Sequence, residues 1–224
     1  MFTGIIQGVG EIVSVSESNT VTSVSINLPN VSALEIGASV AINGVCLTVV
    51  SINGEEVKFD IITETLNRTN LADLSVGSSV NIERSLKFGD EIGGHILSGH
   101  IMATGIIHSR TQSGDQMTFS ILASPSTHKY LTEKGYIAID GISLTVGEVD
   151  NGIFNLHIIP ETLRLTTLGS KQVGDVVNLE IDSDPQSTRN AELHVDQDLS
   201  HTAGHAGWIR SGNENTFVAF SAEL

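Results

Sequence analysis

The chain has 224 residues, of which 40% are hydrophobic and 22 are glycine, a composition that suits short strands joined by tight turns. Its 26 acidic and 11 basic residues give a net charge of −15, which argues against binding to nucleic acids or anionic membranes, because both need a basic surface. The single cysteine, Cys46, excludes an intrachain disulfide and a thiolate metal cluster and is compatible with a cytoplasmic location.

Neither a leader nor a membrane span is expected. The segment from Met1 to Gly10 lacks the basic start and the apolar core of a secretory signal peptide. No run of about 20 apolar residues occurs, so we expect no membrane-spanning helix.

In the first half of the chain, apolar and polar residues alternate from Val24 to Leu28 and from Val57 to Ile61. Period-two alternation over short runs predicts strands with one buried face. Asn53-Gly54, beside the second run, indicates a tight hairpin turn. Another strand is expected over Asn43–Val49, and a short helix after Ile62.

The second half shows the same elements. Apolar residues alternate from Met117 to Ile121 and from Phe154 to Ile158, with Asn151-Gly152 as the turn signal. Pro160 fits the first turn of a second short helix, because the N–H that proline lacks has no partner there.

The two halves are copies of one unit. Three pairs of segments keep a constant spacing of 97 residues, and the opening segment recurs at a spacing two residues shorter: 38–49 with 135–146, 62–66 with 159–163, 76–83 with 173–180, and 3–10 with 98–105. A unit of roughly 95 residues suits a duplicated small domain. We expect each unit to close into a barrel, because closure removes exposed strand edges. The predicted domains are residues 1–94 and 95–184, followed by a tail over 185–224.

Some positions differ between the copies. Cys46 corresponds to Ser143, Asn43 to Asp140, Ile5 to His100, and Ser39 to Tyr136. These differences fall on the opening strand and on the strand around Cys46 or Ser143. Two related pockets with different reactive groups suit a reaction in which two similar molecules play unequal parts.

Four motifs together resemble riboflavin synthases, over both repeats from Met1 to about Asp184. They are Met1-Phe-Thr-Gly-Ile5, Asn43-Gly-Val-Cys-Leu-Thr-Val49, Gly93-Gly-His-Ile-Leu-Ser-Gly-His-Ile101 and Ile139-Asp-Gly-Ile-Ser-Leu-Thr-Val146. The resemblance implies an all-β fold of two tandem six-stranded antiparallel Greek-key barrels, a C-terminal helical segment and a homotrimer. It places the active site between the first barrel of one subunit and the second barrel of a neighbour.

The resemblance also implies a reaction. Two molecules of 6,7-dimethyl-8-ribityllumazine dismutate by four-carbon transfer into riboflavin and 5-amino-6-ribitylamino-2,4(1H,3H)-pyrimidinedione. Neither a metal nor an organic cofactor is expected. One lumazine supplies a carbanion at its acidic C7 methyl group, and the other is activated by addition of a nucleophile.

The resemblance assigns a catalytic part to Cys46, His100, Ser143, Ser39 and Phe2. Cys46 is a candidate nucleophile or ring contact; alternatively it is a small buried apolar side chain. His100 has the pKa class for proton transfer near neutral pH, but it could equally be structural. Phe2 could order the first strand beside a pocket or simply cap a barrel.

A larger set falls on positions that the family uses to bind substrate: Thr48, Glu64, Thr65, Asn81, His95, Lys134, Asp140, Thr145, Glu161, Thr162 and Asp182. Each has a structural alternative. A barrel threonine is often only a good strand former, and an acidic residue at the start of a short helix stabilises that helix.

The tail, residues 185–224, includes a weak helical pattern that could drive trimerisation. His201 and His205 are spaced like a metal pair, but Gly204 weakens a helix there and no third ligand is evident.

The main rival function is that of a non-catalytic antenna that binds lumazine or flavin; this chain keeps Cys46 and His100, which favours catalysis. An oligonucleotide-binding barrel is disfavoured by the acidic charge.

Overall fold

The computed structural model describes residues 1–181, 206–210 and 217–221. The chain divides into two compact units, Met1–Asp182 and Ser183–Leu224. In the second unit, β14 (Ala206–Arg210) pairs with β15 (Phe217–Ser221) as an antiparallel hairpin. Asp182, His201, His205 and the predicted helix at the start of the tail lie outside the described residues.

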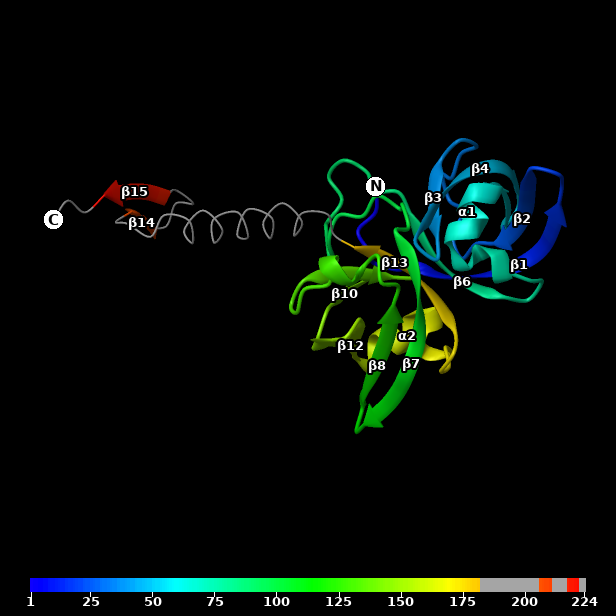
Figure 1. Cartoon of the computed structure of the whole chain (residues 1–224). Coiled ribbons are helices and arrows are strands. Elements are labelled where there is room, and N and C mark those ends of the chain that lie inside the picture. The colour runs from blue at the N-terminus through cyan, green and yellow to red at the C-terminus, as the bar shows by residue number, and fades with distance from the viewer. Residues whose placement is uncertain (182–205, 211–216, 222–224) are drawn as a thin grey trace. The chain divides into compact units, whose positions relative to one another are not determined.

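The first repeat forms a closed barrel of six antiparallel strands, called the N-barrel (blue to cyan in Figure 1). The strand order around the barrel is β1-β2-β5-β4-β3-β6. One short helix, α1 (Thr63–Arg68), follows β5, as expected. The strands are β1 (Gly8–Glu17), β2 (Val21–Asn27), β3 (Ser39–Ile42), β4 (Val45–Asn53), β5 (Glu56–Ile62) and β6 (Ser79–Arg84).

The second repeat, called the C-barrel (green to yellow in Figure 1), has the order β10-β9-β13-β7-β8-β12-β11. Its end strands β10 and β11 are two halves of the segment that corresponds to β4. Gly147 N–H donates to Asn155 O (2.7 Å) and Asn155 N–H donates to Glu148 O (3.0 Å), so pairing continues across the break. The strands are β7 (Ala103–Ser113), β8 (Gln116–Ala123), β9 (Tyr136–Ile139), β10 (Ile142–Thr145), β11 (Val149–Asp150), β12 (Ile153–Ile158) and β13 (Val176–Ile181).

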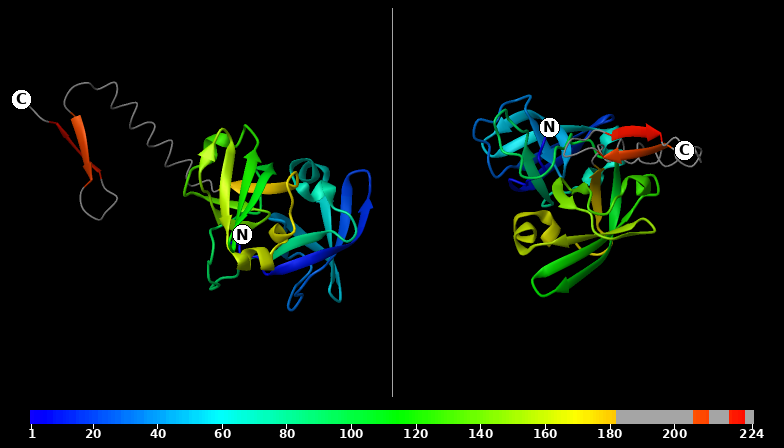
Figure 2. Two further views of the ribbon diagram at one scale, coloured as in Figure 1. Left: turned by 90° about the horizontal axis from the view of Figure 1, so that it is seen from below. Right: turned by 90° about the vertical axis from the view of Figure 1, so that its left-hand side faces the viewer.

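The sequence patterns explain these elements. The alternating apolar residues of β2, β5, β8 and β12 enter two separate barrel cores, with Phe59 and Phe154 fully buried. Gly54-Glu55 connects β4 to β5, one residue beyond the predicted Asn53-Gly54, and Asn151-Gly152 connects β11 to β12 as predicted. Helix α2 (Pro160–Leu165) begins at Pro160 as predicted. Figure 2 shows the two barrels, with α1 and α2, from two further sides.

Within the described part of the chain, no helix has both the length and the apolar character that a membrane crossing requires.

One sequence-based prediction was wrong in detail. Asn43 and Gly44 do not begin a strand but form the two-residue loop between β3 and β4, and Asp140-Gly141 does the same between β9 and β10. Their φ angles are 47° and 80° in the first loop and 45° and 80° in the second, as a type I′ turn requires. Asn-Gly and Asp-Gly tolerate these left-handed conformations.

The two turns meet where the barrels touch. A Cβ atom on Gly44 would lie 2.7 Å from the Gly141 nitrogen, and one on Gly141 would lie 2.8 Å from the Gly44 nitrogen. Glycine is therefore required at both positions by the close approach as well as by the turn.

Hydrogen bonds from buried asparagine side chains hold the two barrels together at this contact. Asn81 Nδ2 donates to Asp140 O (3.0 Å), and Asn178 Nδ2 donates to Asn43 O (2.9 Å), so each barrel supplies the same bond to the other. Asn81 Oδ1 accepts from Thr167 N–H (2.8 Å), and Asn178 Oδ1 accepts from Asn70 N–H (2.7 Å). Equivalent residues of the two repeats thus exchange the same bonds in both directions.

The contact departs from this symmetry at Asp140. Its Oδ1 accepts from Asn178 N–H and from Asn70 Nδ2, both at 2.8 Å, and its Oδ2 lies 3.6 Å from the Lys171 ammonium. Burial raises the pKa of Asp140 above its ordinary 3.8, and the charge of Lys171 with these hydrogen bonds offsets that only in part.

We predict that Asn178→Ala lowers the free energy of unfolding by roughly 2–4 kcal/mol, because it leaves buried peptide groups of Asn43 and Asn70 without partners. Urea denaturation followed by circular dichroism measures this. Asn67→Ala, at an exposed position of α1, is the control and should stay within about 0.5 kcal/mol of wild type. Equal effects of the two substitutions would contradict the role of Asn178.

We also predict a pH signature for Asp140→Asn. Between 3.8 and the raised pKa, the folded state binds more protons at this site than the unfolded state, so this site's contribution to stability falls as pH rises through the raised pKa. The stability of wild type relative to the variant should therefore decrease with pH. Urea denaturation from about pH 4 to pH 8 tests it; a difference independent of pH would contradict it.

Candidate functional site

The C-barrel carries an outward-facing pocket of about 410 Å³, called the C-barrel pocket. Strands β9 and β10, the start of α2 and the link between the repeats surround it. Four predicted residues line it: Lys134, Ser143, Thr145 and Thr162. The full lining is Gly93, Gly94, Lys134, Tyr136, Ser143, Leu144, Thr145, Val146, Gly147, His157, Ile158, Ile159 and Thr162.

A hydroxyl–imidazole pair lies at this pocket. His95 Nδ1 is 2.7 Å from Ser143 Oγ, and the His95 ring stacks on Tyr136 with centroids 5.2 Å apart and planes 23° apart. His95 N–H donates to Thr3 O (3.1 Å), which ties the link to the N-terminal segment. A hydroxyl bonded to an oriented imidazole can accept, hold or pass on a proton.

The corresponding face of the N-barrel carries Cys46. Along β4, Val45, Leu47 and Val49 are buried, whereas Cys46 is half-buried and Thr48 is exposed, so Cys46 and Thr48 share the outer face. Ser39 is the cross-strand partner of Thr48, which places it on that face too.

Gly99, the residue before His100, contacts this face. Gly99 O accepts from Cys46 N–H (2.9 Å), and a Cβ atom on Gly99 would lie 2.6 Å from Cys46 Cβ. His100 is the next residue and is exposed. The structure therefore brings Cys46, Ser39, Thr48 and the backbone leading to His100 together.

Phe2 is buried at the join of the barrels. Phe2 N–H donates to Leu97 O (2.8 Å) and Leu97 N–H donates to Phe2 O (2.9 Å). The Phe2 side chain is 1% exposed and packs with Ala41, Leu97 and Ala138, and Cys46 packs against this cluster. This buried position fits one of the two alternatives for Phe2, that it orders the first strand beside a pocket.

The predicted binding residues at the starts of α1 and α2 fall into two groups, two threonines and two glutamates. Thr162 lines the C-barrel pocket, and Thr65 is its N-barrel equivalent. Glu64 and Glu161 are exposed and pair with Arg68 and Arg164 on their own helices. The hydrogen bond from Arg164 lowers the pKa of Glu161. For both acids this favours the helix-stabilising alternative, and substrate binding by them stays a prediction.

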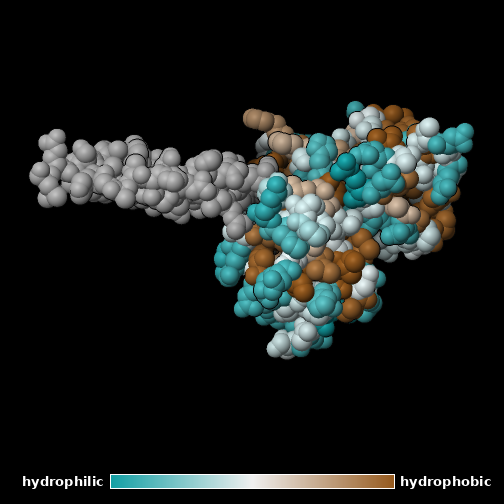
Figure 3. Space-filling view, in the orientation of Figure 1, coloured by the Kyte–Doolittle hydropathy of each residue, from teal (hydrophilic) through white to brown (hydrophobic). Residues whose placement is uncertain are grey.

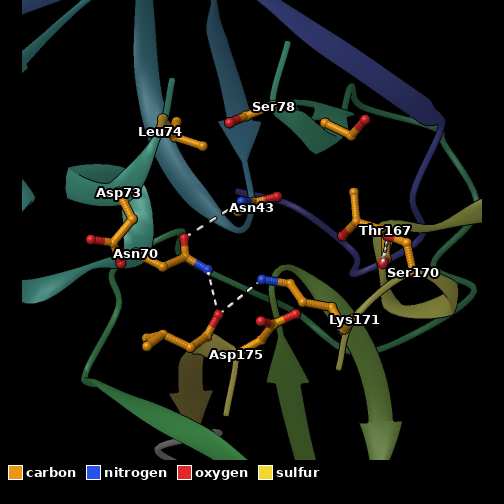
Figure 4. Close-up of a pocket in the computed structure, with 11 residues that line it drawn as sticks. Asn43, Asn70, Asp73, Leu74, Ser78, Thr167, Ser170, Lys171 and Asp175 are labelled. Carbon is orange, nitrogen blue, oxygen red and sulfur yellow. Dashed lines mark hydrogen bonds between the residues drawn. The ribbon is translucent and has the colours of Figure 1, made fainter. Parts of the chain in front are cut away.

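Asn81 and Asp140 lie at the contact between the barrels, and neither lines the C-barrel pocket. A second cavity of about 380 Å³ lies at this contact (Figure 4). Lys171 Nζ and Asn70 Nδ2 both donate to Val176 O there, at 2.9 and 3.2 Å. The cavity shares no lining residue with the C-barrel pocket, and Asn43, Asn70, Thr167 and Lys171 of the inter-barrel network are among its lining residues. Substrate binding by Asn81 and Asp140 stays a prediction.

The sequence-based set omitted Tyr136, His157 and the glycines of the link, all of which line the C-barrel pocket. For two of them, a comparison of the two repeats contains a signal. Tyr136 corresponds to Ser39, and His157 corresponds to Asp60, so both mark differences between otherwise matching strands.

Residues 3–85 and 98–182 each match the family described as "Lumazine binding domain". The two matched ranges contain the N-barrel and C-barrel strands.

Curated relatives include the riboflavin synthase of Escherichia coli (strain K12), 51% identical over 191 residues, covering 84% of this chain and 89% of that protein. The riboflavin synthases of Chlamydia pneumoniae and Mycobacterium bovis are 45% and 44% identical, covering 81% of this chain and 90% and 93% of those proteins.

Among solved structures, LumP complexed with riboflavin matches with a TM-score of 0.76 and 31% identity, over 82% of this chain and 100% of that one. LumP complexed with 6,7-dimethyl-8-(1'-D-ribityl) lumazine matches with a TM-score of 0.75 and 29% identity over the same shares. The chain therefore belongs to the riboflavin synthase family and carries two lumazine binding domains.

Proposed function

We propose that this protein is a riboflavin synthase. It converts two molecules of 6,7-dimethyl-8-ribityllumazine into riboflavin and 5-amino-6-ribitylamino-2,4(1H,3H)-pyrimidinedione by four-carbon transfer. The observation that carries the proposal is the pairing of two homologous barrels whose matching strands present Cys46 in one and Ser143 in the other. Two copies of one pocket fit two copies of one substrate, and their chemical difference fits unequal parts in the reaction.

The C-barrel pocket has groups for holding and deprotonating one lumazine. Tyr136 is 51% exposed at the pocket and offers an aromatic face to a flat heterocycle. The His95–Ser143 pair can relay a proton, and Lys134 adds a positive charge at the rim.

On the N-barrel face, Cys46 contacts Gly99, and His100 is the residue that follows Gly99. Cys46 could add to a lumazine ring as a nucleophile, and His100 could move a proton. Holding two reactants in a productive geometry can contribute several kcal/mol, roughly 7–11 in the best cases, so orientation is the main contribution of the protein. The reaction as proposed uses neither a metal nor an organic cofactor.

We further propose a cytoplasmic homotrimer with domains 1–94 and 95–184 and a tail, 185–224, that takes part in assembly. Both candidate faces point outward, so an active site that joins them can use two subunits. Apolar surface is exposed on the face of the molecule seen in Figure 3 (brown). Ile5, Val9, Ile96 and Ile159 are among the exposed large apolar side chains. Exposed apolar area of this kind is typical of surfaces that a partner covers.

The test is to incubate the purified protein alone with 6,7-dimethyl-8-ribityllumazine and follow riboflavin by its absorbance. We expect riboflavin to approach half an equivalent per lumazine consumed. Binding with shifted fluorescence but without riboflavin would overturn the proposal and support the antenna function instead.

We predict that Cys46→Ser, which copies the residue of the C-barrel, keeps the affinity for riboflavin within about threefold and slows turnover on the order of 100-fold. Fluorescence titration and steady-state kinetics separate the two effects. Ser143→Cys is the reciprocal control, because it changes the same atom in the other barrel. Turnover near wild type in Cys46→Ser would contradict a chemical role of the thiol.

A further inference from the structure

Two buried carboxylates occupy equivalent positions in the repeats, at the ends of the strands that touch the opening segments. Glu83 in β6 is 3% exposed and Glu180 in β13 is 7% exposed. Among the residues that the structure describes, neither forms a salt bridge. Buried carboxylates without a cation need several hydrogen-bond donors, and both have them.

Each carboxylate binds one short peptide. Glu83 accepts from Thr3 N–H (2.6 Å), from the Thr3 hydroxyl (2.8 Å) and from Gly4 N–H (3.0 Å). Glu180 accepts from Ser98 N–H and from the Ser98 hydroxyl, both at 2.7 Å, and from Gly99 N–H at 3.1 Å. Thr3-Gly4 and Ser98-Gly99 are equivalent in the repeat, so the same clamp occurs twice.

Each of these two peptides contacts a strand of the opposite barrel. Gly4 O accepts from Ser143 N–H of the C-barrel (2.9 Å), and Gly99 O accepts from Cys46 N–H of the N-barrel (2.9 Å). A Cβ atom on Gly4 would lie 2.5 Å from Ser143 Cβ, and one on Gly99 would lie 2.6 Å from Cys46 Cβ. Each reactive strand therefore rests on a peptide that is fixed by a carboxylate of the other barrel.

We propose that Glu83 and Glu180 are crossed positioning residues. Glu83 of the N-barrel sets the position of the Ser143 strand in the C-barrel pocket, and Glu180 of the C-barrel sets the position of Cys46 and His100 on the N-barrel. The reactive group of each barrel depends on a carboxylate of the other barrel.

The hydrogen-bond donors offset the burial of Glu83 in part. Burial raises the pKa of Glu83 above its ordinary 4.5, and the hydrogen bonds from Thr3, Gly4 and Ile5 lower it by less. A glutamine at either position keeps the shape but turns one oxygen into an NH₂ group. That group faces a peptide N–H, so at least one charge-assisted hydrogen bond is lost.

The experiment is native-state hydrogen exchange, followed by NMR, on Glu180→Gln and Glu83→Gln in the full chain. In Glu180→Gln we expect the Cys46 amide to exchange about tenfold faster or more, while the Ser143 amide stays within about twofold of wild type. In Glu83→Gln we expect the reverse. Each variant is the matched control of the other, because the chemical change and the burial are the same.

The amides of Phe59 and Phe119, in the two barrel cores, report global unfolding. If Cys46, Ser143 and both core amides accelerate together, the carboxylates are merely structural and the proposal fails. It also fails if Glu180→Gln affects the Ser143 amide more than the Cys46 amide. If a glutamine variant does not fold, Ser98→Ala and Thr3→Ala remove one donor from each clamp and should show the same crossed pattern with smaller factors.

A second measurement uses the single thiol of the chain. The rate of Cys46 alkylation by iodoacetamide should rise several-fold in Glu180→Gln and change less than twofold in Glu83→Gln. Equal rates in the two variants would overturn the proposal. Both measurements are made without lumazine, so their outcome is independent of whether the protein forms riboflavin.

Discussion

The hydrogen bonds that Asn81 and Asn178 make across the barrel contact are the constraint on which the rest of the structure depends. Each side chain is fully buried and donates to the turn of the other barrel, at Asp140 O or Asn43 O. Because a buried amide that loses its partner costs more than a formed bond contributes, the barrels are fixed relative to each other within narrow limits. Gly44 and Gly141 allow the turns to approach closely enough for these bonds to form.

This fixed contact lets short segments pass between the barrels. Phe2 pairs with Leu97, and the peptides that follow them support the strands of Cys46 and Ser143. A small closed barrel alone has a packed interior and little room for a ligand. The C-barrel pocket therefore lies on the outer face, where strand residues of one barrel meet a peptide held by the other.

Duplication explains why this arrangement suits a reaction between two identical molecules. The repeated core keeps the outer faces of the two repeats alike, as the matching strands and short helices show. The exchanged residues make these faces chemically unequal: a thiol on one, and a hydroxyl bonded to an imidazole on the other. The inter-barrel contact is also unequal, since Asp140 and Lys171 form an ion pair where the first repeat has Asn43 and Leu74.

The sequence by itself determined the repeat, the all-β class, the two short helices, the alternating core residues of four strands and four residues of the C-barrel pocket. These features follow from local patterns: period-two burial, turn residues, Pro160 at a helix start and motifs shared with a family. Only the tertiary structure decided that Asn81 and Asp140 lie between the barrels, that Phe2 is buried, and that Tyr136 stacks on His95. It also revealed the partners of Glu83 and Glu180, which lie about 80 residues away along the chain. Contacts of this range depend on how the two repeats pack against each other, and no local pattern in either repeat specifies that packing.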